Sequence, residues 1–344
     1  METREIIEKI KTKKRELGNK LIILTHHYQR KNIIDIGDFK GDSFALSAQA
    51  TKDKNVQYIV FCGVHFMAES AAILAMPHQV VQIPDSDAGC WMADMADSFI
   101  LEKVWNEITD IVQKETIIPI VYMNSDAHIK AHCGRNNGTI CTSSNAAKAF
   151  KWAFEREQKI FFFPDEHLGR NTANALGIPR HKIIVWDPEQ PFGGNTIKSI
   201  KKAHVILWKG YCLVHSRFTA ENIKTMRKKY PEAKIVVHPE CTEEIVALSD
   251  AVGSTGFIVN YVKNAQKDST IIIGTEINLV ERLDFEYTDK TIIPLKKSLC
   301  PNMYKINPAN LLHTLESIGS INVVEVENSI KKDAKLALDR MLTL

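Results

Sequence analysis

Short apolar runs rich in isoleucine and valine alternate with helix-like segments along most of the chain. Such runs are typical of strands buried on both faces, as in parallel sheets whose connections are helices. The pattern predicts strands at residues 21–25, 57–62, 79–83, 117–122, 159–163, 203–208, 234–238, 270–273 and 291–294. Because nine strands exceed the usual size of one sheet, we expect an α/β protein with more than one sheet.

A self-similar unit occurs three times in the sequence. The stretches LIILTHHY, IPIVYMNS and KIVVHPEC each end an apolar run with polar side chains two positions apart. Each is followed by a segment in which a small hydroxyl residue opens a predicted helix: GDSFALSAQA, TSSNAAKAF and GSTGFIVNYV. The aligned polar pairs are His26 with Tyr28, Tyr122 with Asn124, and His238 with Glu240, and the aligned hydroxyl residues are Ser43, Ser143 and Thr255. Such periodicity indicates a repeated supersecondary unit.

A third strand in each unit leads to a cysteine, so that Cys90, Cys212 and Cys300 occupy equivalent places. The distance from the first strand-end residue to the cysteine is 64, 90 and 62 positions in the three units. The long middle unit contains a further strand-like run, KIIVW, which indicates an insertion at the surface. Unless the units resemble one another by chance, we expect three similar α/β domains at residues 1–98, 99–212 and 213–300, with residues 301–344 packing back on the first.

The three equivalent cysteines suggest a metal site. Ligands in α/β proteins bind at the carboxyl ends of parallel strands, and three domains facing one another would bring the three thiols together there. Zinc and an iron-sulfur cluster both suit thiolate ligands, and the spacing of these cysteines does not decide between them. A single cysteine is otherwise as well explained as a small buried apolar residue, which is our interpretation of Cys62 and Cys241.

The remaining polar residues of the units have both a structural and a functional interpretation. The hydroxyl residues Ser43, Ser143 and Thr255 are either N-caps or part of an anion pocket at converging helix N-termini. The strand-end histidines are either structural or proton-transfer groups, and His27 alternates to the opposite face of its strand. His215, three residues after Cys212, either orients a ligand or caps a helix, and Cys133 and Cys141 are either core residues or a small metal or redox pair.

Composition and charge restrict the class of protein. The chain has 44 Lys and Arg against 41 Asp and Glu, a formal net charge of +3 and no long run of either sign, so we expect binding to neither nucleic acid nor membrane. The N-terminus lacks the apolar core of a signal peptide, and no apolar stretch approaches the roughly 20 residues of a membrane span. We therefore predict a cytoplasmic protein, in which seven scattered cysteines favour metal ligation or catalysis over disulfides.

Eleven motifs, in order, resemble those of the quinolinate synthase (NadA) family of NAD biosynthesis. They are HHYQ, DIGDFKGDS, GCWMAD, YMNSDAHIKAH, CTSSNA, FFPDEHLGRNTA, WKGYCLVH, HPEC, GSTG, GTEINLV and CPNM. The resemblance implies three similar α/β domains about a pseudo-threefold axis. It also implies one [4Fe-4S] cluster held by Cys90, Cys212 and Cys300, with one iron left open. The four extra residues in HCGRNNGTIC and the insertion before WKGYC suggest a longer subgroup.

The resemblance further implies a reaction and its residues. Iminoaspartate and dihydroxyacetone phosphate would condense to quinolinate with loss of phosphate and water, and an aspartate-oxidising enzyme would supply the iminoaspartate. The open iron would act as a Lewis acid. Of the matching residues, we expect Tyr28 and Glu240 to transfer protons, with Glu240 the more natural base. The implied substrate contacts are His26, Ser43, Tyr122, Met123, Asn124, Ser143, His238, Pro239, Glu240 and Thr255, of which Met123 and Pro239 contribute backbone or shape.

Two other functions use the same residues. A zinc-dependent hydrolase would hold its metal with the three cysteines, and a histidine or Glu240 would activate a zinc-bound water. A non-enzymatic cluster-containing sensor would need a partner-binding module, and the sequence contains no basic patch or nucleic-acid motif of that kind. The C-terminal segment INVVEVENSIKKDAKLALDRMLTL predicts a short strand and an amphipathic helix.

Overall fold

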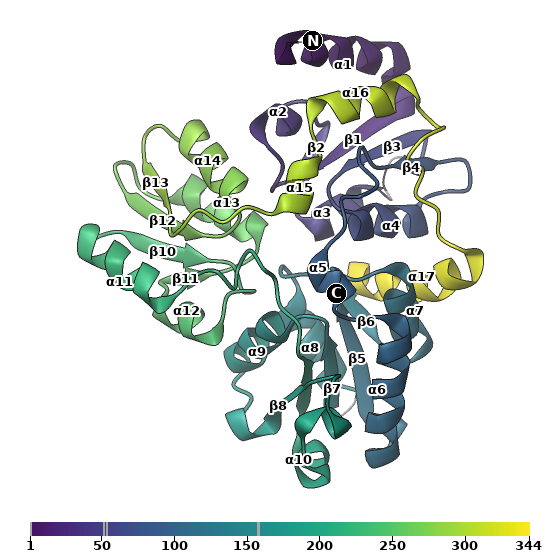
Figure 1. The fold of residues 1–344 in the computed structure, drawn as a ribbon, viewed down its shortest axis with the longest axis vertical. Helices are drawn as coiled ribbons and strands as arrows, with labels where there is room; N and C mark the ends of the chain where they lie inside the picture. The colour runs from purple at the N-terminus through teal and green to yellow at the C-terminus, as the bar shows by residue number, and fades with distance from the viewer. Residues whose placement is uncertain (1, 51, 53, 157–158) are drawn as a thin grey trace.

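The computed structural model describes residues 2–50, 52, 54–156 and 159–344, and it shows three lobes around a common centre (Figure 1). In these residues the strands form three sheets, and every strand pair within a sheet is parallel. Their apolar runs are buried because helices cover the faces of each sheet. The prediction of an α/β protein with short parallel sheets in three similar domains is confirmed.

The three sheets share one strand order. The first unit contains β1 (Leu21–His26), β2 (Phe39–Gly41), β3 (Tyr58–Cys62) and β4 (Val80–Gln82), in the order β2-β1-β3-β4. The third contains β10 (Lys234–Val237), β11 (Ala251–Val252), β12 (Thr270–Gly274) and β13 (Thr291–Pro294), in the order β11-β10-β12-β13. The second contains β5 (Ile117–Tyr122), β6 (Thr139–Cys141), β7 (Lys159–Phe163), β8 (Ile183–Trp186) and β9 (Val205–Trp208), in the order β6-β5-β7-β9-β8. The second order is the same with β8 added at one edge.

The predicted strands are confirmed to within two residues at either end, and the strand-like run KIIVW is β8. The sequence did not predict β2, β6 or β11, which each contain two or three residues. Strands this short carry no alternation of their own, and these three, unlike the equally short β4, do not lie in a longer apolar run. In each unit the missed strand borders the first strand and precedes the predicted hydroxyl segment, so it places that segment beside the strand end.

The helices of the first two units alternate with their strands. Those of the first unit are α1 (Thr3–Leu17), α2 (Lys31–Ile34), α3 (Ser43–Ala50), α4 (His65–Leu74) and α5 (Trp91–Asp94). Those of the second unit are α6 (Ser98–Ile111), α7 (Ala127–Arg135), α8 (Ala146–Phe154), α9 (Glu166–Ala175) and α10 (Ile197–Lys202). Helices α3 and α8 are the ones predicted after the hydroxyl residues of the first and second units.

The third unit and the C-terminal segment complete the fold. The helices are α11 (Ala220–Lys229), α12 (Glu243–Leu248), α13 (Thr255–Asn264), α14 (Ile277–Glu286), α15 (Pro301–Lys305), α16 (Pro308–Glu316) and α17 (Asn328–Thr343). Short 3-10 helices occur at Gly18–Lys20, Lys114–Thr116, Arg180–Lys182 and Pro191–Gly194. Within the described residues, none of the helices has the length and apolar character needed to cross a bilayer.

The C-terminal segment joins two of the units. Val323 forms an antiparallel bridge with Gln82 at the edge of the first sheet. Helix α17 lies beside α7 and β6 of the second unit and also contacts α4 of the first (Figure 1). This close approach requires a glycine at residue 134, because a Cβ there would lie 1.9 Å from the carbonyl oxygen of Asp333. The helix predicted for this segment is present as α17, whereas the predicted short strand is reduced to the single bridge at Val323.

Candidate active site

One cavity with an empty volume of about 620 Å³ lies where the carboxyl ends of the three sheets meet. It is lined from all three units and from the segments that carry the three equivalent cysteines. The lining residues are His26, Tyr28, Asp42, Ser43, Val64, Phe66, Met67, Gly89, Cys90, Tyr122, Asn124, Thr142, Ser143, Cys212, Val214, His238, Glu240, Thr255, Cys300 and Met303. None of them comes from residues 176–207, so the insertion lies away from the cavity, as expected.

The fold brings most of the predicted site residues into this lining. Met123 and Pro239 do not line the cavity; both directly follow a strand-end residue that does. The Met123 backbone N–H donates to the Cys141 carbonyl, and the Pro239 carbonyl accepts from Asn171. His27 also lies outside the lining, where its Nδ1 is 3.2 Å from Nη2 of Arg282.

The first and third units hold their strand-end histidines in the same way. The backbone N–H of Tyr28 donates to Nδ1 of His26 at 3.2 Å, and that of Glu240 donates to Nδ1 of His238 at 3.4 Å. Burial lowers the pKa of each imidazole to about 3. A neutral ring that accepts at Nδ1 carries its proton at Nε2, so each histidine offers one N–H donor and no charge.

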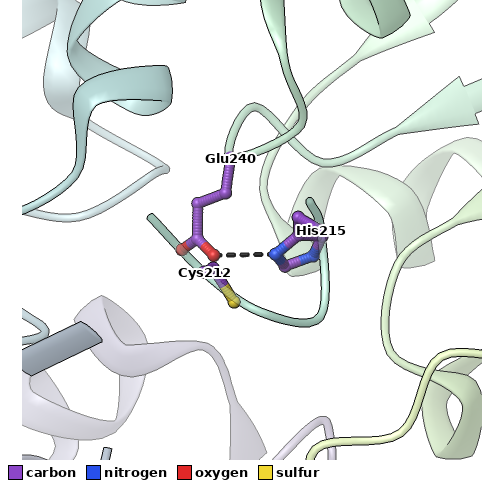
Figure 2. A group of neighbouring side chains, drawn as sticks. All are labelled: Cys212, His215 and Glu240. Carbon is purple, nitrogen blue, oxygen red and sulfur yellow. Dashed lines mark hydrogen bonds and ion pairs between the residues drawn. The ribbon is translucent and has the colours of Figure 1, made fainter. Parts of the chain in front are cut away.

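Glu240 is the centre of a buried hydrogen-bond network. Its Oε2 accepts from His215 Nδ1 at 2.7 Å (Figure 2), and its Oε1 accepts from the Tyr122 hydroxyl. The ring of His215 stacks on that of His238, with centroids 4.5 Å apart. Burial acts to raise the pKa of the Glu240 carboxyl, but the facing histidines and these two hydrogen bonds hold it below its usual value. Glu240 is therefore an ionised carboxylate inside the protein.

The network continues from His215 to the other predicted proton-transfer residue. His215 Nε2 lies 3.1 Å from Oγ1 of Thr275 and 3.4 Å from the Tyr28 hydroxyl, and Tyr28 and Thr275 are 2.8 Å apart. Burial and the charge of Glu240 raise the pKa of Tyr28 well above its usual value, so Tyr28 is a neutral phenol near pH 7. Sequence reasoning left His215 open and missed Thr275, although Thr275 directly follows the buried strand β12.

The three equivalent cysteines are half-buried and free. Cys90 and Cys300 immediately precede α5 and α15, and backbone N–H groups of the following residues face all three sulfurs. Burial raises the pKa of the Cys90 thiol to about 12, and it raises the pKa of the other two as well. Without a metal these thiols are protonated, while the N–H groups are placed to stabilise thiolates.

Comparisons with known proteins bear directly on this arrangement. The family model described as quinolinate synthetase A protein (NadA) matches residues 8–343. The quinolinate synthase of Corynebacterium glutamicum is 46% identical over 345 residues, covering 99% of this chain and 88% of the relative. Those of Herpetosiphon aurantiacus and Bacillus cytotoxicus are 47% and 46% identical over 99% of this chain and 92% and 94% of their own lengths. The chain belongs to the quinolinate synthase family.

Membership of the quinolinate synthase family confirms the resemblance found in the motifs. Cys90, Cys212 and Cys300 lie in three of those motifs. A second donor set overlaps these cysteines: ligand atoms of Cys212, His215 and Glu240 lie within 4.8 Å of one another (Figure 2). It is the one group of three or more His, Cys, Asp or Glu ligands with metal-site spacing among the described residues. In this structure the imidazole and carboxylate of that group are hydrogen-bonded to each other.

The hydroxyl residues of the quinolinate synthase motifs are not N-caps. Helix α3 is capped by Asp42, which accepts from the Ala45 N–H at 2.9 Å, and α13 is capped by Ser254, which accepts from the Phe257 N–H at 3.2 Å. Ser43 and Thr255 are the first residues of these helices, whereas Ser143 lies in the turn before α8. In the described part of the chain no hydrogen bond involves these three side-chain hydroxyls. They are therefore available to a ligand in the cavity.

The other cysteines belong to the core. Cys62, Cys133, Cys141 and Cys241 are free and fully buried. Burial raises the pKa of the Cys133 and Cys141 thiols, and within the described residues neither belongs to a group with metal-site spacing. This supports the core interpretation of Cys62 and Cys241 and favours it over a metal or redox pair for the other two.

Proposed function

We propose that this protein synthesises quinolinate by condensing iminoaspartate with dihydroxyacetone phosphate, releasing phosphate and water. The observation that carries the proposal is the match to the quinolinate synthase family over nearly the whole chain. The cavity supports it because it combines neutral N–H and O–H donors for anionic substrates with a buried carboxylate for proton transfer.

We also propose that Cys90, Cys212 and Cys300 hold a [4Fe-4S] cluster with one iron open to the cavity. The residues fit such a group, because three half-buried thiols from different segments line one cavity and are faced by backbone N–H groups. When bound, the cluster supplies a Lewis acid for the loss of a hydroxyl group. No observation specifically favours a zinc hydrolase or a sensor over this family assignment.

The chain itself would hold the substrates by their negative charges. His26 and His238 offer Nε2–H donors, and the free hydroxyls of Ser43 and Thr255 stand at the first residues of α3 and α13. Backbone N–H groups and the helix dipole at these two N-termini favour carboxylate and phosphate groups. Tyr122, Asn124 and Ser143 would contribute substrate contacts from the second unit. Met123 and Pro239, which do not line the cavity, would contribute only backbone or shape.

Glu240 and Tyr28 divide the proton transfers between them. Joining the two substrates requires removal of a proton from the carbon beside the imine, and Glu240 is the ionised group in the network. Loss of a hydroxyl as water requires a proton donor, and the neutral phenol of Tyr28 is one. His215 and Thr275 connect the two residues by hydrogen bonds, and so hold the base and the acid in one network.

The remaining proposals concern the cellular context. Iminoaspartate carries an imine that water hydrolyses, so the proposed supply by an aspartate-oxidising enzyme would have to operate close by. We keep the cytoplasm as the proposed location and the domain boundaries after residues 98, 212 and 300 as proposed boundaries.

The proposed function is tested anaerobically. Full-length protein purified without oxygen should be brown, with iron and sulfide in roughly equal amounts. Freshly generated iminoaspartate and dihydroxyacetone phosphate should then yield quinolinate and phosphate together. A protein with a full cluster that forms no quinolinate would contradict the proposal, and a colourless protein with stoichiometric zinc would favour the hydrolase instead.

A further inference from the structure

The loop that carries Glu240 is held by a helix from another unit. Helix α9 belongs to the second unit, whereas the loop follows β10 in the third. The side-chain amide nitrogen of Asn171 on α9 donates to the Pro239 carbonyl at 2.9 Å and to the Cys241 carbonyl at 2.8 Å. These carbonyls belong to the two residues that flank Glu240, so one side chain holds the backbone on both sides of it.

The orientation of the Asn171 amide follows from its surroundings. Both neighbours are carbonyl oxygens, which only accept hydrogen bonds, so the nitrogen and not the oxygen of the amide must face them. The amide oxygen is buried and has no partner among the described residues. Asn171 is 7% exposed, and removal of its nitrogen would leave two carbonyls without this donor in a site that water hardly reaches.

Helix α9 is a firm support for this donor. Asp165 caps it by accepting from the Leu168 N–H at 2.7 Å, and Leu168 and Ala173 are buried against the second sheet. A Cβ at Gly169 would lie 2.5 Å from both Leu207 and Phe162, so the glycine lets the helix lie directly on the strands. The donor position is therefore set by the core of the second unit and not by the loop.

Rotation of the backbone at residue 240 would break at least one of the two Asn171 hydrogen bonds. The same rotation would move the carboxylate, which lies 2.7 Å from His215 and also accepts from Tyr122. We propose that Asn171 is a positioning residue for Glu240, which it aims at His215 and Tyr122 by holding both flanking carbonyls. This inference rests on the proposed function for its effect on turnover, but its structural part does not.

The main test replaces Asn171 with a residue of similar size that cannot donate. In the cluster-loaded full chain, Asn171→Leu should lower kcat by about 10- to 100-fold, because small misplacements of a reacting group are costly, and should change KM by less than about threefold. Iron content and the cluster absorption should be unchanged. Asn171→Ala is a second variant with the same expectation, and it suits a helix better.

Asn174→Leu is the matched control on the same helix. Asn174 is exposed and its amide bonds to the carboxylate of Glu243 at 3.0 Å, not to the backbone beside Glu240. Exposed contacts of this kind contribute little, so kcat should stay within about twofold of the wild type. A comparable loss of kcat in Asn174→Leu would show that any change on this face of α9 disturbs turnover, and it would overturn the specific role of Asn171.

Hydrogen exchange of the full chain without its cluster tests the same idea independently of turnover. Backbone amides of residues 240–243 should exchange faster in Asn171→Leu and Asn171→Ala than in the wild type and in Asn174→Leu. Unchanged exchange in both Asn171 variants, or kcat within about twofold of wild type in a stably folded Asn171→Ala, would overturn the inference. Absence of quinolinate from cluster-loaded wild type would instead contradict the proposed function, and the exchange result would still decide the role of Asn171.

Discussion

The two sides of the cavity are prepared to different degrees. On the side of the proposed acid-base residues, Glu240, His215 and Thr275 are almost fully buried and hydrogen-bonded in sequence, and Tyr28 and Tyr122 also hydrogen-bond to this group. On the cysteine side, three half-buried thiols are faced by backbone N–H groups. A buried carboxylate must be paired within the fold, so the pairing on the first side is complete once the chain has folded. In the proposed function, the second side becomes active only when a metal group replaces the thiol protons.

This difference indicates how the two sides should respond to change. Alterations on the cysteine side should remove the metal group and leave the fold, because the cores of the three sheets are built without it. Alterations on the acid-base side should leave the metal group and remove proton transfer.

Replacement of a proposed cluster cysteine should have the largest effect. Cys90→Ser should lose most of its iron and at least about 1000-fold in turnover, since a metal contributes several kcal/mol to the transition state. Its far-ultraviolet circular dichroism should match that of the wild type. Cys62→Ala, which alters a buried cysteine outside the cavity, is the control and should keep its iron. An iron-loaded and active Cys90→Ser would remove Cys90 from the ligand set.

Glu240→Gln should come next. The amide keeps the shape of the side chain but cannot accept a proton, so turnover should fall by about 10²- to 10⁴-fold. Iron content and cluster absorption should equal those of the wild type, because the substitution leaves the cysteine side intact. Near-normal turnover would exclude Glu240 as the base, and loss of iron would show that the two sides are not separate.

Thr275→Val tests the connection between His215 and Tyr28. It removes the hydroxyl that lies 3.1 Å from His215 and 2.8 Å from Tyr28, and we expect a fall in kcat of about 10- to 100-fold with little change in KM. Thr270→Val, at the opposite end of the same strand, is the matched control and should have wild-type kinetics. Equal kinetics for the two variants would remove Thr275 from proton transfer.

Ser43→Ala should have the smallest effect. Loss of one hydroxyl bonded to a charged substrate group costs about 1.5–3 kcal/mol at most, so KM should rise by about 10-fold while kcat changes little. Ser47 lies one turn further along α3, and its hydroxyl donates to the Ser43 carbonyl. Ser47→Ala is therefore the control, and it should leave KM unchanged. A fall in kcat with unchanged KM would place Ser43 among the proton-transfer groups instead.

Much of the fold and part of the candidate site could be predicted because both depend on local patterns. The long strands have buried runs of Ile, Val and Phe, and each strand end is marked by a change from apolar to polar residues. The repeat then aligned the strand-end residues and the cysteines. The edge strands β2, β6 and β11 were not predictable, since they have only two or three residues and lie in no longer apolar run.

The functions of particular polar residues were harder to predict. No sequence spacing connects Thr275 with Tyr28, 247 positions away, or Asn171 with the loop around Glu240. The choice of N-cap was also open, because Asp42 and Ser43, like Ser254 and Thr255, are adjacent and both able to cap. Small differences in local backbone direction decide such choices, and the residue pattern does not specify them.

The sequence alone determined that this chain forms repeated parallel α/β units and that three cysteines end them, because hydrophobic periodicity and repetition are properties of the chain itself. Only the tertiary structure decided which side chains meet in the cavity. Glu240, His215 and Tyr28 come from separate segments, and their partnership depends on how three sheets face one another. Their surroundings in that shared space also set their charges: neighbouring groups keep Glu240 ionised against the effect of burial, and burial keeps Tyr28 neutral, since these effects shift a pKa only after folding.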